Sequence, residues 1–236
     1  MSPLLIFAAA LLPPVLLGMY IWRKDPKKEP ASQLMRAAVW GIAISIPVAS
    51  IEYIIQTWLF GSVGGSPTTL WGTTVQAFCV AALPEEAAKL FALWIILRKN
   101  PYFDEHFDGI VYAVFVSLGF AAVENVAYVL GSADWMSVAI SRALLSVPGH
   151  YAFAVLMGYY YSVYHFIDHS KRYAVCVLLV PVLAHGVYDA IALGSAVDPL
   201  IGSVAFVVLV YFCIKMHKQA RIRIESLIER DKKTGK

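Results

Sequence analysis

The chain has 236 residues, of which 59% are hydrophobic and only 15% are charged, and its formal net charge is +3. Soluble domains carry about a quarter charged residues, so this composition excludes an ordinary soluble domain and indicates a polytopic membrane protein. The three cysteines lie far apart within apolar stretches, which fits neither a disulfide framework nor a zinc-binding motif.

A helix that crosses a membrane needs about 20 predominantly apolar residues. Stretches of this kind predict seven spans, at 3–22, 35–59, 72–97, 109–131, 137–164, 173–195 and 198–215. Basic residues follow the first span but do not precede it, so we expect a retained anchor and not a cleaved signal peptide. The predicted fold is an all-α bundle of about seven transmembrane helices, with a membrane domain at 1–217 and a basic cytoplasmic tail at 218–236.

The basic residues predict the orientation of this bundle. Alternate connections, at 23–36, 98–99, 171–172 and after 214, hold 17 of the 19 Lys and Arg residues. The positive-inside rule then places the N-terminus outside and the C-terminus in the cytoplasm. The basic tail is expected to contact the lipid bilayer and not nucleic acid, because it is short and lacks a nucleic-acid-binding fold. The sequence contains no glycine-rich phosphate-binding loop, so no nucleotide partner is predicted.

Ionisable side chains within the spans are the candidate functional residues. Each costs about 2.5–3.5 kcal/mol to insert, so such groups usually face a protein interior or a water-filled cavity. Those in the predicted spans are Glu52, Glu85, Glu86, Lys89, Glu124 (followed by Asn125), His150, His185 and Asp189. By helical rise, Glu85 and His150 lie about 18–20 Å from the outer ends of their spans, and Glu124 and His185 about 8–12 Å. We therefore expect them to share one polar site in the middle-to-outer part of the bilayer.

Two further charged residues have simpler explanations. Arg142 lies near the outer end of its predicted span and can be explained as an interfacial residue. Glu52 is expected to be a helix-packing contact or a residue that lines the cavity. Neither is predicted to be catalytic.

Prolines lie close to three of the candidate residues: Pro84 immediately before Glu85, Pro148 two residues before His150, and Pro181 four residues before His185. A proline frees backbone groups in a helix, and such irregular backbone is tolerated at membrane depth where it is buried in protein or lines a wet cavity. The prolines therefore predict distorted helices around a polar cavity inside the membrane.

Helical spacing assigns partners within the set. Lys89 is four residues from Glu85 and three from Glu86, so it can pair with either carboxylate. The two adjacent glutamates point about 100° apart and are expected to have different roles. Asp189 shares a helix face with His185 and could orient its ring or stabilise its charge.

Four sequence motifs together resemble the PrsW family, bacterial intramembrane proteases related to the CAAX-prenyl type II endopeptidases. The motifs are Leu83-Pro-Glu-Glu-Ala-Ala-Lys89, Phe103-Asp-Glu-His-Phe-Asp-Gly-Ile-Val-Tyr112, Ser117-Leu-Gly-Phe-Ala-Ala-Val-Glu-Asn125 and His185-Gly-Val-Tyr-Asp189. The resemblance runs from Asp25 to about residue 212. One motif alone would be weak evidence for this resemblance, but all four in order on successive membrane segments are specific to the family.

The resemblance implies a multi-pass protease of the bacterial cell membrane. Its substrate would be a single-span anti-sigma factor, cut near the outer surface as the first cleavage of a stress response. The family motifs imply that Glu85, Glu86 and His185 are essential, that Glu124, His150 and Asp189 complete the site, and that Lys89 and Asn125 support it.

Peptide hydrolysis requires a water, a base that activates it and a donor for the tetrahedral oxyanion. We expect Glu85 or Glu86 to be the base, with the other glutamate paired to Lys89. His185 would donate to the oxyanion or the leaving group. His150 and Glu124 would position the water or relay a second proton.

Three alternatives stay open at this point. Glu85, Glu86, His150 and His185 could bind zinc, although no HExxH motif is present; no cofactor is therefore predicted, with zinc possible. A proton-coupled transporter would also hold ionisable groups beside broken helices, but it would more often show an internal repeat, and none is found. A non-catalytic membrane scaffold could keep the same residues only to hold its polar interior.

Overall fold

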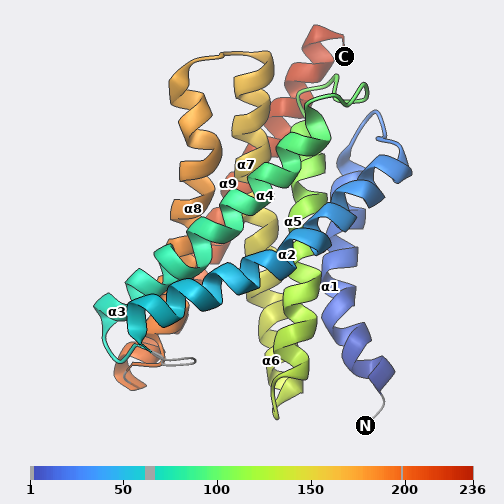
Figure 1. Ribbon diagram of the computed structural model, residues 1–236. Coiled ribbons are helices and arrows are strands. Elements are labelled where there is room, and N and C mark those ends of the chain that lie inside the picture. The colour runs from blue at the N-terminus through green and yellow to red at the C-terminus, as the bar shows by residue number, and fades with distance from the viewer. Residues whose placement is uncertain (1–2, 62–66, 198, 236) are drawn as a thin grey trace.

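The computed structural model describes residues 3–61, 67–197 and 199–235. These residues form helices joined by short connections, with no strand among them (Figure 1). In chain order the helical elements are α1 (Pro3–Lys24), α2 (Ala31–Phe60), α3 (Leu70–Val75), the π-helical η1 (Gln76–Ala82), α4 (Leu83–Leu97), α5 (Asp108–Leu130), α6 (Trp135–Ser141), the π-helical η2 (Arg142–Ser146), α7 (Val147–Phe166), α8 (Lys171–Gly194) and α9 (Pro199–Thr234).

These elements make seven helical paths, because α3, η1 and α4 follow one another without a break, as do α6, η2 and α7. Six of the paths are long and apolar enough to cross a membrane. The exception is the path at Leu70–Leu97, which is interrupted by η1 and carries Glu85, Glu86 and Lys89. The all-α, multi-pass membrane fold is confirmed. The orientation of its ends stays a prediction.

Helix α5 is the centre of the bundle and packs against α1, α2, α4 and α7. Two glycines let α5 and α2 approach closely. A Cβ added to Gly41 would lie 1.9 Å from the backbone oxygen of Val116, and one added to Gly119 would lie 2.2 Å from that of Ala38. Small residues at such crossings allow the backbones of membrane helices to touch.

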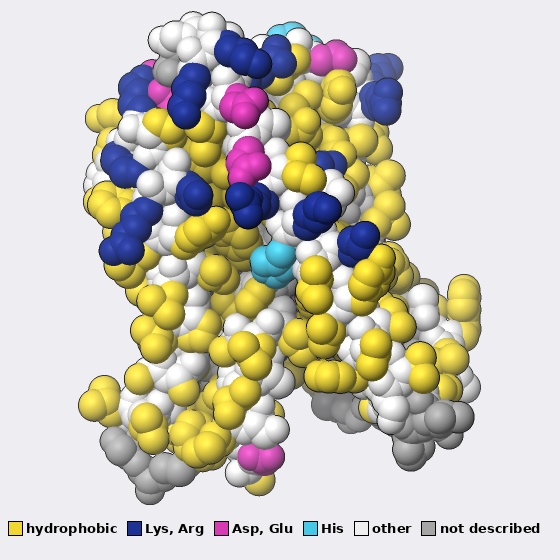
Figure 2. Space-filling model, turned by 180° about the vertical axis from the view of Figure 1, so that it is seen from behind, with side chains coloured by type: hydrophobic (Ala, Val, Ile, Leu, Met, Phe, Trp, Pro, Cys, Tyr) yellow, Lys and Arg dark blue, Asp and Glu magenta, His cyan; other side chains and the backbone are white. Residues whose placement is uncertain are grey.

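The outer surface is sorted by chemistry. Hydrophobic side chains cover much of the face in Figure 2, while Lys and Arg gather toward the end that holds the C-terminus. Large apolar residues on this surface are highly exposed, including Trp58 at 81% and Leu4 at 77%. In a bilayer these residues contact lipid, because proteins in water rarely expose so large an apolar surface.

The last helix extends well beyond its predicted span. Helix α9 crosses the predicted boundary between residues 217 and 218 without a break. In its second half Ala220, Ile224 and Leu227 are buried in the hydrophobic core, and α9 packs along α7. The boundary itself stays a prediction. Residues 62–66, part of the predicted outer connection at 60–71, lie outside the described residues.

Both π-helical segments stand directly before a proline. Pro84 is the second residue of α4, after η1, and Pro148 is the second residue of α7, after η2. Proline has no backbone N–H to donate and its ring clashes with the preceding turn, so a wider π-helical turn accommodates it within a continuous helix. Such turns occur often at functional sites.

Candidate active site

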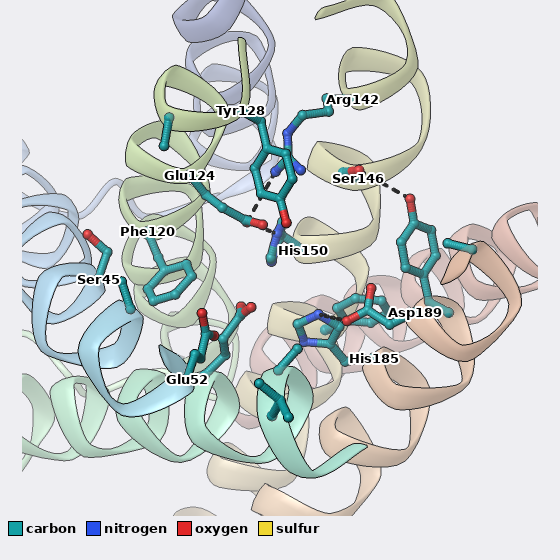
Figure 3. Close-up of a pocket in the computed structure, with 18 of the residues that line it drawn as sticks. Ser45, Glu52, Phe120, Glu124, Tyr128, Arg142, Ser146, His150, His185 and Asp189 are labelled. Carbon is teal, nitrogen blue, oxygen red and sulfur yellow. Dashed lines mark hydrogen bonds and ion pairs between the residues drawn. The ribbon is translucent and has the colours of Figure 1, made fainter. Parts of the chain in front are cut away.

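A cavity of about 440 Å³ lies between α2, η1, α4, α5, α7 and α8. Its polar lining residues include Glu52, Glu85, Glu124, Tyr128, Arg142, Ser146, His150, His185, Tyr188 and Asp189. Figure 3 shows Glu124, His150, His185 and Asp189 around one space. The predicted polar cavity inside the helical bundle is therefore present, and it is lined by side chains from spans far apart in the sequence.

Lys89 is the centre of the charged network. Its Nζ donates to Glu85 Oε2 at 2.8 Å and to Glu86 Oε1 at 2.9 Å, and it lies 3.2 Å from His150 Nδ1. It also lies 4.4 Å from the centre of the Phe120 ring. Lys89 is only 1% exposed, so one buried ammonium is shared between two buried carboxylates.

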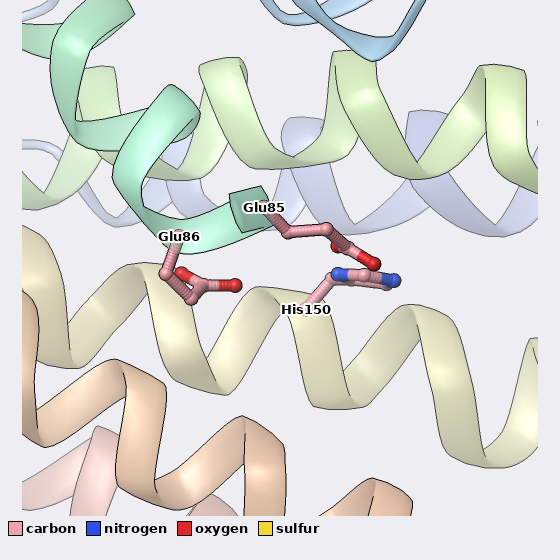
Figure 4. Close-up of side chains that lie close together, drawn as sticks. All are labelled: Glu85, Glu86 and His150. Carbon is pink, nitrogen blue, oxygen red and sulfur yellow. The ribbon is translucent and has the colours of Figure 1, made fainter. Parts of the chain in front are cut away.

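The two adjacent glutamates occupy different environments. Glu85 lines the cavity, whereas Glu86 is 1% exposed and is not among the lining residues. Figure 4 shows the carboxylate of Glu85 beside the His150 ring, while the side chain of Glu86 leaves the helix in another direction. This difference agrees with the divergence of about 100° expected for neighbours in a helix.

His185 lies between two carboxylates. Its Nδ1 is 2.9 Å from Glu86 Oε1 and its Nε2 is 3.2 Å from Asp189 Oδ2. Its ring stacks on Phe153, with the ring centres 4.9 Å apart and the planes inclined by 18°. The structure therefore places Asp189 on His185, the position that helical spacing indicates.

His150 connects α7 to two other helices. Its Nε2 lies 2.7 Å from Glu124 Oε2 on α5, and its Nδ1 faces Lys89 on α4. The ammonium of Lys89 can only donate, so His150 Nδ1 accepts and the imidazole proton lies on Nε2, toward Glu124. Ser117 Oγ donates to the backbone oxygen of His150 at 3.1 Å and holds α5 against α7 at this point.

Arg142 belongs to the site, although the sequence explained it as interfacial. It is 8% exposed, its Nη2 lies 3.1 Å from Glu124 Oε2, and its Nε donates to Asn125 Oδ1 at 2.6 Å. Its guanidinium also lies 4.3 Å from the centre of the Tyr128 ring. One feature of the sequence could have indicated this pair. The predicted span of Glu124 contains no Lys or Arg, and the next predicted span contains one arginine, Arg142.

Asn125 has a supporting role, as its oxygen accepts from Arg142 and its Nδ2 donates to the backbone oxygen of Ala10 in α1 at 3.1 Å. Glu52 lines the cavity, and its Oε1 is buried without a hydrogen-bond partner among the described residues. On the opposite wall Ser146 Oγ lies 3.3 Å from the hydroxyl of Tyr188, a pair that the sequence did not indicate.

The fold and the cavity define the class of protein: a multi-pass membrane bundle with carboxylates, histidines and a lysine buried together in its interior. A family model described as "PrsW family intramembrane metalloprotease" matches residues 29–215. The chain belongs to the PrsW family, and it is a peptidase and a multi-pass bacterial membrane protein. The family match favours the protease prediction over the transporter and scaffold alternatives.

Several similar proteins are each named "Protease PrsW". The protein of Geobacillus kaustophilus is 36% identical over 192 residues, which cover 80% of each chain. The protein of Clostridioides difficile is 34% identical over 79% of this chain and 78% of its own. That of Bacillus subtilis is 34% identical over 92% of this chain and 95% of its own. No solved structure matches this chain.

The family description implies a metal, and the site contains groups that could bind one. Ligand atoms of Glu85, Glu86 and His150 all lie within 4.8 Å of one another. The ammonium of Lys89, however, is within 3.2 Å of an atom of each of these three residues, so it already takes the place of a cation among them. As arranged, the cluster does not fit a metal ion unless Lys89 moves away.

Proposed function

We propose that this protein hydrolyses a peptide bond in a single-span membrane protein, close to the outer membrane surface, with Glu85 as the general base. The observation that carries the proposal is the difference between the two glutamates. Glu85 lines the cavity with its carboxylate held by Lys89, whereas Glu86 lies behind it and pairs with Lys89 and His185. Only Glu85 of this pair can reach a water in the cavity.

In the proposed reaction, Glu85 accepts a proton from a cavity water as the water oxygen attacks the carbonyl carbon of the substrate. The resulting tetrahedral intermediate carries an oxyanion. Glu85 then transfers the same proton to the leaving nitrogen as the C–N bond breaks, which yields a carboxylic acid and an amine. A positioned general base of this kind contributes about 10²–10⁴-fold to the rate.

His185 is the proposed donor to the oxyanion. Both of its ring nitrogens face carboxylate oxygens, and it can donate from both only as an imidazolium. Asp189 is the more distant of its two partners and lines the cavity, so a substrate oxygen could replace Asp189 at Nε2 while Glu86 keeps Nδ1 in place. A preorganised cationic donor in a buried site stabilises developing negative charge strongly.

The remaining groups act as positioning residues. Glu124 holds the His150 proton on Nε2, and Arg142 with Asn125 holds Glu124. His150 thereby has a fixed orientation beside Glu85, where it can orient the attacking water. Glu86 and Lys89 fix His185 and Glu85 on the other side.

The substrate class follows from the family resemblance and the position of the site inside the bundle. A single-span anti-sigma factor is the proposed partner, and its cleavage would begin a stress response. The lipid bilayer is the second partner, since the substrate must approach the cavity from the membrane.

A cleavage assay in reconstituted bilayers, with a panel of single-span anti-sigma factors, tests the proposal. Glu85→Gln should lower the cleavage rate by at least about 100-fold. The matched control is Glu225→Gln, the same change at a side chain on α9 that is 54% exposed, and it should cleave like the wild type. Full activity of Glu85→Gln would show that another residue is the base.

Chelation tests the metal question separately. Because Lys89 occupies the position between Glu85, Glu86 and His150, we expect 1,10-phenanthroline, which binds zinc but not Mg²⁺ or Ca²⁺, to leave the cleavage rate unchanged. Loss of activity in chelator, with recovery on addition of zinc, would instead show that Lys89 moves and a metal takes its place.

A further inference from the structure

A second group of carboxylates lies buried at the ends of the helices, where the α1–α2 and α4–α5 connections meet the end of α9. Its members are each 6% exposed or less: Asp25, Glu29, Glu105, Asp108 and Asp231. The sequence motif Phe103–Tyr112 supplies two of them, and the proposed hydrolysis uses none of that motif. Asp108 begins α5 sixteen residues before Glu124, about 24 Å along the helix, so this group is separate from the cavity.

Three of these residues converge. One carboxylate oxygen from each of Asp25, Glu105 and Asp108 lies within 4.8 Å of the other two. The Oδ2 atom of Asp108 accepts from the backbone N–H groups of Asp104, at 3.1 Å, and Glu105, at 2.7 Å, so the carboxylate is held in place. Its Oδ1 atom is buried and has no hydrogen-bond partner in the part of the chain that the structure describes.

The lysines nearby compensate little of the negative charge of these three carboxylates. Lys27 Nζ lies 2.9 Å from the exposed Asp104 and 3.7 Å from Glu105. Lys28 Nζ donates to backbone oxygens, including that of Trp22 at 2.6 Å. Among the described residues, neither Asp25 nor Asp108 has a salt bridge. The Asp25 carboxylate accepts from the backbone N–H groups of Lys27, at 3.1 Å, and Glu29, at 3.2 Å, so only Asp108 Oδ1 lacks a partner. A buried charge without a partner is costly.

The other members of the group are used by the protein itself. Asp231 accepts from the backbone N–H of His106 at 2.9 Å and from that of Phe107 at 3.0 Å, just before α5 begins. Glu29 accepts from the hydroxyl of Tyr112. So many buried acids in one place need a proton or a cation.

We infer that Asp25, Glu105 and Asp108 form a binding site for a hard divalent cation, Mg²⁺ or Ca²⁺, which fastens the α1–α2 connection to the start of α5. All three ligands are carboxylates, the chemistry that both ions prefer, and no His or Cys among them favours zinc. One oxygen from each carboxylate lies within 4.8 Å of the other two, a spacing from which all three could reach one ion of either kind.

The test is the thermal stability of the full-length protein in detergent after EDTA treatment, with MgCl₂ or CaCl₂ added back in separate arms. A ligand that binds the folded state at about 100 times its Kd should raise the Tm by several degrees, on the order of 5 °C. Asp25→Asn and Glu105→Gln should abolish this rise. The control is Asp104→Asn, in the same loop but 54% exposed and outside the ligand set, which should keep it.

A cation site differs from a purely structural cluster in how the stabilities of wild type and variants are ordered with and without the cation. In EDTA the neutral variants should be at least as stable as the wild type, because like-charge repulsion is relieved, whereas in saturating cation the wild type should be the more stable. Asp108→Asn provides a third variant if one of the other two does not fold.

Calorimetric titration of the stripped protein with each ion should find one site per chain, still present in Glu86→Gln and absent in Asp25→Asn. The response to one ion but not the other identifies the cation. No binding and no Tm change with either ion, or an equal response in wild type and Asp25→Asn, would overturn the inference. None of these readouts depends on proteolytic activity.

Discussion

Lys89 is the residue on which the charge balance of the candidate active site depends. Its ammonium contacts Glu85 and Glu86 within its own helix and approaches His150 from a neighbouring helix. All four groups are buried, so solvent screens their charges only weakly. A buried ion pair contributes little net stability when intact, yet removal of one partner leaves an uncompensated charge and is strongly destabilising.

Lys89→Met should therefore destabilise the protein by about 3–5 kcal/mol, measured as the free energy of unfolding in mixed detergent. The same substitution should cost less in a Glu86→Gln background, since one of the two stranded carboxylates is then neutral. A double-mutant cycle isolates this coupling. Strictly additive effects would show that Lys89 and Glu86 do not interact in the folded protein.

Arg142 makes a second prediction at this scale. Its guanidinium reaches Glu124 and Asn125 at once and stacks near Tyr128, which requires the planar fork that lysine lacks. Arg142→Lys should lower the cleavage rate on the order of 10- to 100-fold, because His150 is positioned through Glu124. A merely interfacial arginine would accept lysine, so unchanged cleavage by a folded Arg142→Lys protein would contradict this role.

The contrast between these residues shows what a sequence reveals about a site. The contacts of Lys89 with its glutamates and of Asp189 with His185 join residues three or four apart in one helix, so helical geometry alone predicts them. The pair of Arg142 and Glu124 joins two helices, and its existence depends on how η2 lies against α5. Helical rise alone placed His150 about 18–20 Å and Glu124 about 8–12 Å from the outer ends of their spans, so it did not indicate that these two side chains meet.

At the scale of elements, the crossing of α2 and α5 depends on the absence of side chains. A Cβ at Gly41 would lie 1.9 Å from a backbone oxygen, which cannot move aside as a flexible side chain can. Helix α2 also carries Glu52 to the cavity, so the crossing affects both the packing of the bundle and the shape of the site.

Gly41→Ala should force α2 away from α5 and destabilise the protein by about 1–3 kcal/mol, a typical cost of overpacking. The matched control is Gly18→Ala in α1, where the new Cβ would lie 3.7 Å from the Phe115 ring in ordinary contact. The free energy of unfolding in mixed detergent compares the two. Equal stability of both variants would show that the α2–α5 crossing is looser than the structure indicates.

Elements were predictable where hydrophobicity alone defines them. Six paths satisfy length and composition, but the path that carries the active-site glutamates does not, since it trades apolar residues for charged ones. The prolines predicted distorted helices, and η1 and η2 bear this out beside Pro84 and Pro148, but Pro181 lies inside the uninterrupted helix α8. The π-helical form itself is a detail of backbone hydrogen bonding that the sequence pattern does not predict. The second half of α9 has a polar, charged composition that indicated a tail, yet three of its apolar residues reach the core.

At the scale of the whole molecule, the charge asymmetry gives the bundle a direction. Lys and Arg gather toward the C-terminal end in Figure 2, and the same end holds the connections that contain Lys99 and Lys171. The connection between α5 and α6 at the opposite end contains no Lys or Arg. The positive-inside rule places the basic end in the cytoplasm.

Single cysteines test this orientation in cells, after Cys79, Cys176 and Cys213 are replaced by alanine or serine. A membrane-impermeant maleimide should label Ala133→Cys, which lies in the connection without basic residues, and should label Lys99→Cys only after the cells are opened. Both positions are exposed, so accessibility in the folded protein does not separate them. The reverse pattern would move the proposed cation site to the outer side, where Ca²⁺ would be the expected ion, and would place the cavity nearer the cytoplasm. Because the proposed cleavage lies close to the outer surface, that result would also require a substrate cut from the other side.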